Sequence, residues 1–256
     1  MAAPASTVPV VSVHHYTDRL FKFRVKRPKN FRFESGQFAM IGLNIEDEPI
    51  MRAYSMASPS WDDELEFYSI IVPDGPLTSQ LRYIKPEDPL LISGRGVGSL
   101  TMKALKPGKR LFMLATGTGI APFASIMRDP DTYERFDEVY LTHTCREAAE
   151  LSYGKELVAA LREDPLCGEF ANKLTYYSSV TREEYEHMGR ITDLLESGQV
   201  FSDLGIAPFD AEGDRVMICG SMELNRDLQK ILEAQGFVEG SRRQKGSYVL
   251  ERAFVG

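Results

Sequence analysis

A strand, a glycine turn and the start of a helix in the middle of the chain constrain the fold more than any other feature. Residues 111–115 read LFMLA, an unbroken apolar run typical of strands buried on both faces. Gly117 and Gly119 permit a tight turn, and Pro122 suits the first turn of a helix because its missing N–H costs nothing there. Such a turn suits a phosphate or a dinucleotide. Pro122 replaces the third glycine of GxGxxG, so a packed turn without a ligand is the alternative.

The residues after this turn alternate between buried strands and amphipathic helices. The pattern predicts helices over residues 151–162 and 222–235, and strands over residues 138–142, 173–179, 216–219 and 248–254. Strands spaced by helices favour a mostly parallel, doubly wound α/β sheet.

The first hundred residues show short alternating strands instead. We expect strands over 20–26, 38–43 and 65–72 and a short helix over 77–83, which together indicate an antiparallel β-barrel or sandwich. With 256 residues, of which 43% are hydrophobic, the chain can bury two cores. A proline and glycine loop at 106–109 marks the boundary, so we expect one domain over residues 1–104 and a second over residues 105–256.

Composition and charge argue against several classes of protein. The net charge of −7 disfavours general nucleic-acid binding, which requires basic surface. No apolar run approaches the roughly 20 residues that span a bilayer, and the N-terminus lacks the pattern of a secretory signal, so we expect a cytoplasmic protein that does not enter a membrane. The three cysteines and four histidines lack metal-ligand spacing, and we expect no metal site.

The tetrapeptide Arg52-Ala53-Tyr54-Ser55 places a cation, an aromatic ring and a hydroxyl on one extended segment. In a regular strand Arg52 and Tyr54 share one side and Ser55 lies on the other, so contact of all three with one ligand requires a bend or a bulge. The alternative is a purely structural role, with Tyr54 half-buried and Arg52 paired to a carboxylate.

Residues 75–79 read GPLTS and form a turn before the short helix. Free backbone N–H groups and the hydroxyls of Thr78 and Ser79 suit a phosphate, and the arrangement fits a pyrophosphate. Ordinary capping of the helix by Thr78 or Ser79 is the alternative.

Polar residues also follow the predicted strands of the second half. Arg146 and Arg182 come just after strand ends and Arg190 lies in a loop, and carboxyl ends of parallel strands are where ligands bind. Guanidinium groups there suit a dianionic phosphate, whereas a site for NAD usually carries an acidic residue. A surface role is the alternative for each arginine. Cys219 ends a strand beside Gly220, and it either packs in the core or lines a nicotinamide pocket.

A basic segment lies near the N-terminus. Residues 22–32 alternate apolar and basic side chains in their first part, so a strand there presents several cations on one face. Two interpretations stay open: a solvated edge strand that lysine protects from aggregation, or a patch that steers an acidic protein partner.

In their order and spacing, these motifs resemble those of the bacterial-type ferredoxin–NADP+ reductases. The resemblance runs through RAYS, GPLTSQL, TGTGIAPF, TREEYEHMGRITDLL, ICGSMEL and YVLERAFVG, and so covers nearly the whole chain. It implies two domains: an antiparallel β-barrel that binds FAD, followed by a doubly wound α/β domain that binds NADP(H), with the flavin at their interface.

The resemblance also implies roles for individual residues. Arg52 and residues 75–79 bind the FAD phosphates, Tyr54 stacks on the flavin ring, Ser55 lies near flavin N5, and residues 68–72 line the ring. The 2′-phosphate of NADP contacts Arg146, Arg182 and Arg190. The catalytic candidates are Ser55, Cys219, Ala253 and Phe254. The cofactor-binding candidates are Arg52, Ala53, Tyr54, Ser55, Tyr68, Ile70, Val72, Gly75, Leu77, Thr78, Ser79, Thr118, Gly119, Arg146, Thr181, Arg182, Arg190, Cys219, Gly220, Ala253 and Phe254.

The implied function is exchange of a hydride between NADP(H) and flavin N5, and of single electrons with ferredoxin or flavodoxin. Two alternatives stay open: an NAD(P)H-dependent reductase of a small molecule such as free flavin or a quinone, and an electron-transfer subunit of a larger complex. We expect a monomer.

Overall fold

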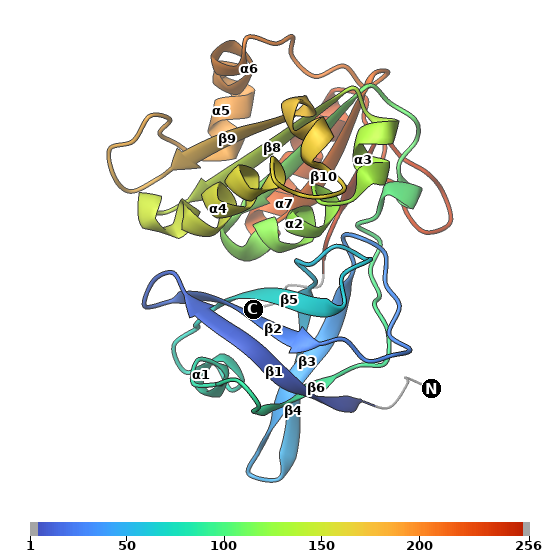
Figure 1. The fold of residues 1–256 in the computed structure, drawn as a ribbon. Coiled ribbons are helices and arrows are strands. Elements are labelled where there is room, and N and C mark those ends of the chain that lie inside the picture. Colours follow the sequence, from blue (N-terminus) through green and yellow to red (C-terminus); the bar gives the residue numbers. More distant parts are fainter. Residues whose placement is uncertain (1–4, 253–256) are drawn as a thin grey trace.

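Two β-sheets organise the chain, one in each half of the sequence. The computed structural model describes residues 5–252. Figure 1 shows the sheet of the first half below and the sheet of the second half above, with helices between them and beyond the upper sheet.

The first sheet is antiparallel and has six strands in the order β4-β3-β6-β1-β2-β5. A bridge between Met56 and Phe67 brings the end of β4 against β5, which closes the sheet into a barrel around buried side chains such as Phe23 and Ile41. The elements are β1 (Ser6–His15), β2 (Leu20–Lys26), β3 (Phe38–Ile45), β4 (Glu48–Ser55), β5 (Glu64–Ile70), α1 (Thr78–Leu81), β6 (Pro89–Ile92) and η1 (Met102–Ala104). The expected antiparallel barrel is confirmed.

The second sheet is parallel, with five strands in the order β11-β10-β7-β8-β9. Its strands are β7 (Arg110–Thr116), β8 (Glu138–Cys145), β9 (Leu174–Val180), β10 (Asp214–Cys219) and β11 (Tyr248–Leu250). Its helices are η2 (Gly117–Ile120), α2 (Ala121–Ile126), α3 (Pro130–Arg135), η3 (Ala148–Leu151), α4 (Ser152–Leu161), η4 (Gly168–Lys173), α5 (Ile191–Glu196), α6 (Gln199–Leu204) and α7 (Met222–Ala234).

Helices cover both faces of this parallel sheet. Along β7, Leu111 and Met113 pack into the core shared with α2, α3 and α4, whereas Phe112 and Leu114 pack against α5, α6 and α7. Alternate side chains of a strand point to opposite faces, so the apolar run at 111–115 is buried on both sides. The doubly wound α/β prediction is confirmed.

The ends of several elements differ from those predicted. β5 ends at Ile70 rather than at Val72, and β11 ends at Leu250. The helix of the first domain covers only four residues. The pattern missed β1, because Pro9 interrupts it and a register shift follows at Val10, and such irregularities obscure the period of a strand.

One hydrophobic cluster contains residues from both halves of the chain, beside the barrel's own core. Leu20 and Tyr68 of the barrel lie in the same buried cluster as Met113 and Tyr153 of the second half. The rings of Tyr68 and Tyr153 are stacked, with centroids 4.2 Å apart and planes 22° apart. Because this apolar contact is continuous, the barrel and the α/β half are packed together rather than joined only by the chain.

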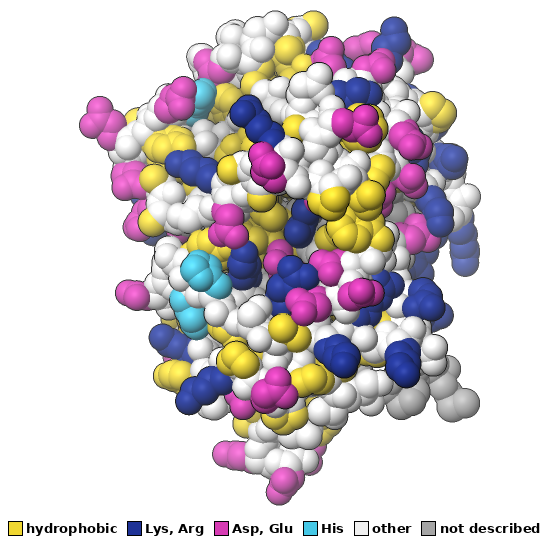
Figure 2. Space-filling model, in the orientation of Figure 1, with side chains coloured by type: hydrophobic (Ala, Val, Ile, Leu, Met, Phe, Trp, Pro, Cys, Tyr) yellow, Lys and Arg dark blue, Asp and Glu magenta, His cyan; other side chains and the backbone are white. Residues whose placement is uncertain are grey.

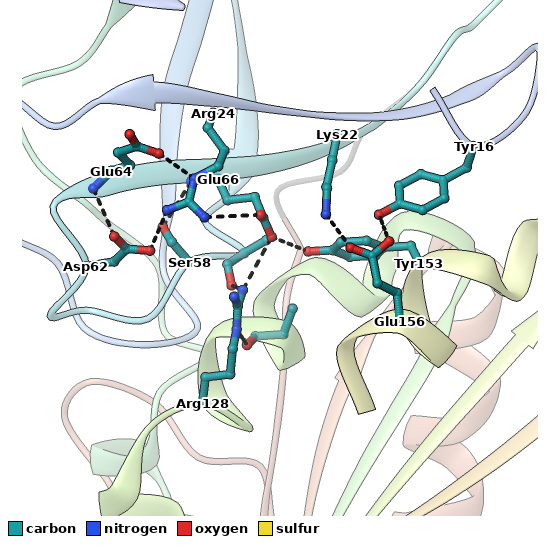
Figure 3. A network of polar contacts seen from close by, with 12 residues as sticks. Tyr16, Lys22, Arg24, Ser58, Asp62, Glu64, Glu66, Arg128, Tyr153 and Glu156 are labelled. Atoms are coloured by element: carbon teal, nitrogen blue, oxygen red, sulfur yellow. Dashed lines mark hydrogen bonds and ion pairs between the residues drawn. The ribbon is translucent and has the colours of Figure 1, made fainter. Parts of the chain in front are cut away.

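A buried carboxyl group adds a polar contact across the same interface (Figure 3). Glu66 of β5 is only 3% exposed and its Oε1 accepts a hydrogen bond from the Tyr153 hydroxyl at 2.8 Å. Arg128 lies 3.3 Å from the same carboxyl group, and Arg24 lies 3.8 Å from its other oxygen. Arg128 also donates to the Ala57 carbonyl. Cations and donors from both halves therefore converge on Glu66.

The basic segment does not form the surface that its pattern indicates. β2 lies between β1 and β5, so it is not an edge strand. Lys22 is 2.6 Å from Glu156 of α4, which also accepts from Tyr16 at 2.5 Å, and Arg24 is paired with Asp62 and Glu64. On the face drawn in Figure 2, basic and acidic side chains are interspersed. The interpretation as an edge strand is therefore wrong, and Lys22 and Arg24 form ion pairs within the molecule. The patch for an acidic partner stays a prediction.

The turn after β7 is held by a buried histidine. His143 of β8 is 0% exposed, its Nε2 is 2.9 Å from the Gly117 carbonyl and its Nδ1 is 3.1 Å from the Tyr176 hydroxyl. Burial lowers the pKa of His143 from 6.5 to about 4, because a charged ring loses its hydration there. The histidine is therefore neutral at pH 7.

Replacing Glu66 with alanine should destabilise the protein strongly. The change leaves Arg128 and Arg24 without their shared buried carboxylate and removes the partner of Tyr153, so we expect the free energy of unfolding to fall by about 2–4 kcal/mol. The matched control is Lys103→Ala, which breaks a pair with Glu34 in which the lysine is 77% exposed. That change should cost below about 1 kcal/mol in urea denaturation. Equal losses in the two variants would contradict the assignment.

His143 should make stability depend on pH in a defined window. The unfolded chain takes up a proton at the ordinary pKa of 6.5, whereas the folded protein does so only near pH 4, so stability is full above the window and is lost as pH falls through it. The slope should reach as much as about 1.4 kcal/mol per pH unit. Urea denaturation at several pH values should show a flatter profile in His143→Gln, and parallel profiles would contradict the prediction.

Candidate functional site

A cleft of about 420 Å³ opens at the carboxyl ends of β7, β8 and β10. Ile70 and Leu20, which pair between β5 and β2 of the barrel, line one side of it. The site residues predicted from the sequence that line it are Ile70, Thr118, Gly119, Arg146, Thr181, Arg190 and Gly220. Residues from both halves of the chain therefore meet around one space, at the sheet edge where parallel α/β folds bind ligands.

The glycine turn at residues 117–119 lines this cleft. Gly117 has a φ of 52°, a left-handed conformation that favours glycine. A Cβ atom on Gly119 would overlap the backbone carbonyl of Cys219, so glycine is required for the ends of β7 and β10 to approach each other. The turn thus brings backbone of two strands to the ligand side of the sheet.

Basic side chains gather at the β8 and β9 end of the cleft. Arg146 follows β8, Arg190 precedes α5, and both line the space together with Thr181. Arg182 is exposed and does not line it, but its backbone N–H donates to the Arg146 carbonyl at 3.0 Å, so these two arginines are neighbours. Forked guanidinium groups beside a cleft suit a phosphate dianion.

Acidic groups lie at the same cleft. Glu150, Glu223 and Asp227 are among its lining residues, and Arg190 is 3.5 Å from Glu223. Both members of that pair are more than 60% exposed, at 67% and 62%, so the contact is weak and leaves Arg190 able to turn toward a ligand.

Cys219 packs in the core rather than lining the cleft. Its side chain is 0% exposed, and burial raises the pKa of its thiol well above the ordinary value. A neutral buried thiol is a poor nucleophile. Its neighbour Gly220 does line the cleft.

Two buried residues that carry hydroxyl groups lie opposite each other where the barrel closes. The bridge between Met56 and Phe67 sets Ser55 opposite Tyr68 in the antiparallel register. Within the described residues, neither Ser55 Oγ nor the Tyr68 hydroxyl has a hydrogen-bond partner. Buried polar groups are normally satisfied, so this pair indicates a bound group with polar atoms beside an apolar and aromatic wall.

The tetrapeptide at 52–55 forms the end of β4. Its register with β3 runs unbroken from Ser55 opposite Phe38, so no bulge redirects the side chains. Arg52 is exposed on the same side as Tyr54, whose hydroxyl is 3.1 Å from Ser69 Oγ, and Ser55 is buried on the other side. A single ligand reaches all three only by extending around the end of the strand.

The hydroxyl of Thr78, in the turn at 75–79, already makes hydrogen bonds to neighbouring backbone. Thr78 Oγ1 accepts from the Val72 N–H at 3.1 Å and donates to the Val72 carbonyl at 3.2 Å, and no side chain caps the helix α1. The capping alternative is therefore wrong. Ser79 remains half-buried and Leu77 is buried in the barrel core.

Some residues of the cleft were not predicted. Thr144 and Cys145 line it at the end of β8, two and three residues beyond the predicted strand end at residue 142. The rule that ligands bind at carboxyl ends of parallel strands would have selected them if the strand had been predicted at its full length. Nothing in the sequence around Tyr153 and Glu66 indicated their contact, because only packing of the two halves brings them together. Ala253 and Phe254 lie outside the described residues.

Residues 5–252 contain no helix that is both long and apolar enough to cross a membrane. Within the same residues, no cluster of three or more His, Cys, Asp or Glu side chains is arranged to hold a metal ion.

Comparison with known proteins agrees with this architecture. Residues 9–102 match the family model of the oxidoreductase FAD-binding domain, and residues 113–230 match that of the oxidoreductase NAD-binding domain. The flavodoxin/ferredoxin–NADP reductase of Rhodobacter capsulatus is 58% identical over 99% of this chain and 96% of the relative. The ferredoxin–NADP reductase of Pseudomonas aeruginosa is 46% identical over 97% of each chain.

A solved structure is also similar over the whole length. The crystal structure of a ferredoxin NADP+ reductase from Neisseria gonorrhoeae with bound FAD and NADP has a TM-score of 0.89 and 30% identity, covering 98% of this chain and 100% of that one. Relatives this similar over nearly the full length establish the family. The chain belongs to the ferredoxin/flavodoxin–NADP reductases and is an oxidoreductase whose cofactors are FAD and NADP(H).

Proposed function

We propose that the protein exchanges a hydride between NADP(H) and N5 of its FAD, and exchanges single electrons with ferredoxin or flavodoxin. The observation that carries this proposal is the cleft between the two halves, lined by Ile70 of the barrel and by the glycine turn of the α/β half. A hydride moves only between atoms in near-contact, so a site at this junction is what the reaction needs.

The barrel residues fit a flavin. The unpartnered hydroxyls of Ser55 and Tyr68 would hydrogen-bond the polar edge of the ring system, and Tyr54 would contact its face. Arg52, exposed at the same strand end, would pair with the FAD phosphates. Bound FAD supplies the chemistry that links two-electron and one-electron transfer. The protein orients it and keeps it beside the cleft.

The α/β residues fit NADP rather than NAD. Arg146 and Arg190 line the cleft, and Arg182 adjoins Arg146 through a backbone hydrogen bond. We propose that these three groups hold the 2′-phosphate, at the opposite end of the cleft from the flavin. Thr118 and Gly119 would then contact the nicotinamide half, and Cys219 would support that end through its backbone beside Gly119.

The remaining proposals concern organisation. We place the domain boundary between Ala104, which ends η1, and Leu105. The cysteines at positions 145, 167 and 219 are buried free thiols, which suits a reducing compartment and supports a cytoplasmic location. A monomer stays a prediction.

The proposed function can be tested on the purified flavoprotein. Anaerobic NADPH should bleach the flavin absorbance, and oxidised ferredoxin or flavodoxin should restore it in a saturable reaction that weakens with salt, because these carriers would bind through charged groups. Failure of both carriers, with rapid reoxidation by free flavin or a quinone, would favour the small-molecule reductase. A colourless protein that FAD cannot reconstitute would reject the proposal entirely.

Arg182→Ala should separate the two nicotinamide cofactors. Loss of a charge-assisted hydrogen bond to the 2′-phosphate costs about 1.5–3 kcal/mol, so the apparent KM for NADPH should rise by roughly 10-fold to 150-fold while that for NADH changes little. Steady-state kinetics with both cofactors measures this. Arg162→Ala, at the exposed end of α4, is the matched control. Equal effects on both cofactors would remove Arg182 from the phosphate site.

A further inference from the structure

The contacts of the buried histidine beside the glycine turn favour one tautomer. Nε2 of His143 faces the Gly117 carbonyl at 2.9 Å, and a carbonyl oxygen only accepts, so Nε2 carries the proton. Nδ1 must then accept, and its partner at 3.1 Å is the hydroxyl of Tyr176 on β9. The chain of donors runs from Tyr176 through His143 to Gly117, entirely beneath the cleft.

This arrangement fixes the orientation of one peptide group. Residues 5–252 contain no cis peptide bond, so the Gly117 carbonyl and the Thr118 N–H point in opposite directions. With the carbonyl bonded inward to His143, the Thr118 N–H points away from His143. Gly117 and Thr118 both line the cleft, so the N–H that points away from His143 belongs to a peptide group beside the ligand space.

Neighbouring residues hold the histidine in place. The Cys145 sulfur, two residues along β8, lies 3.2 Å from Nε2. Gly154 of α4 packs directly over the ring: a Cβ atom there would lie 2.8 Å from His143 Nδ1 and 2.6 Å from the Tyr176 hydroxyl. Only a glycine lets the helix approach so closely, so α4 packs tightly against the ring.

We propose that His143 is a positioning residue for the nicotinamide half of NADP(H). It acts through Gly117, holding the peptide between Gly117 and Thr118 so that the turn presents its N–H to the ligand at the flavin end of the cleft. The inference rests on the proposed function, because it takes the nicotinamide to lie against this turn. Neither of the hydrogen bonds of His143 to Tyr176 and Gly117 involves Arg146, Arg182 or Arg190, so we expect the arginine end of the cleft to keep its affinity when these bonds are removed.

The test compares the two ends of the cleft in the FAD-loaded protein. The variants are His143→Leu, which removes both hydrogen bonds, Tyr176→Phe, which removes only the outer one, and His143→Gln, whose amide can still donate to Gly117. The matched control is Tyr177→Phe, which deletes a hydroxyl on the same strand that donates to Asp203 at 2.7 Å on the other face of the sheet. Each protein is titrated with 2′-phospho-AMP and with NADP+, and flavin bleaching by NADPH is followed by stopped flow.

We expect a selective loss at the nicotinamide end. In His143→Leu the hydride-transfer rate should fall about tenfold, since a buried carbonyl loses its donor, and in Tyr176→Phe by a smaller factor. His143→Gln should recover most of the rate, and Tyr177→Phe should match the unmodified protein. The dissociation constant of 2′-phospho-AMP should stay within about twofold in all of them.

Three outcomes would overturn the proposal. One is a hydride-transfer rate equal to that of the unmodified protein in both His143→Leu and Tyr176→Phe. If the leucine variant does not fold, an equal rate in Tyr176→Phe alone is sufficient. Another is an equal loss of 2′-phospho-AMP affinity, which would mean that His143 supports the whole domain. The third is failure of NADPH to bleach the flavin of the unmodified protein, which would reject the proposed function itself. This outcome is distinguished from the other two because it is seen without any variant.

Discussion

The contact between β5 of the barrel and helix α4 is the constraint on which the rest of the site depends. Tyr68 stacks on Tyr153 at 4.2 Å, and the hydroxyl of Tyr153 donates to the buried carboxyl group of Glu66. The apolar stack and the buried charge reinforce each other, because the aromatic rings exclude water from the hydrogen bond. The strand that carries Tyr68 and Ile70 is thereby held against the domain that carries the glycine turn.

Because this contact fixes the position of β5 relative to the parallel sheet, the cleft has an apolar end and a basic end. Ile70 and the turn at 117–119 meet at the domain junction, while Arg146 and Arg190 lie farther along the parallel sheet. A long ligand with a phosphate at one end and an apolar ring at the other matches this arrangement. The proposed hydride transfer is sensitive to small displacements, so rigid packing between the two halves would keep its reacting atoms in place.

The basic segment shows why charge patterns mislead. Lys22 and Arg24 alternate with apolar residues as they would on a surface strand, yet Glu156 and Glu66 neutralise them from distant parts of the chain. The periodicity of β2 was predicted correctly, but its neighbours in the sheet were not, and the neighbours decide whether a cation is free. His143 is a similar case: its isolated position in the sequence gave no sign that it supports Gly117.

Local pattern determined most of the strands along the chain, the parallel and antiparallel halves, and the glycine turn, because alternation, apolar runs and Gly or Pro positions act through the backbone over a few residues. The motifs and their spacing also determined the family. Tertiary structure alone decided which polar groups meet: Tyr153 with Glu66, Glu66 with Arg128, and His143 with Tyr176. Each of these pairs joins separate elements of the fold, and only closure of the barrel and packing of the sheets bring such residues within a hydrogen-bond length of each other.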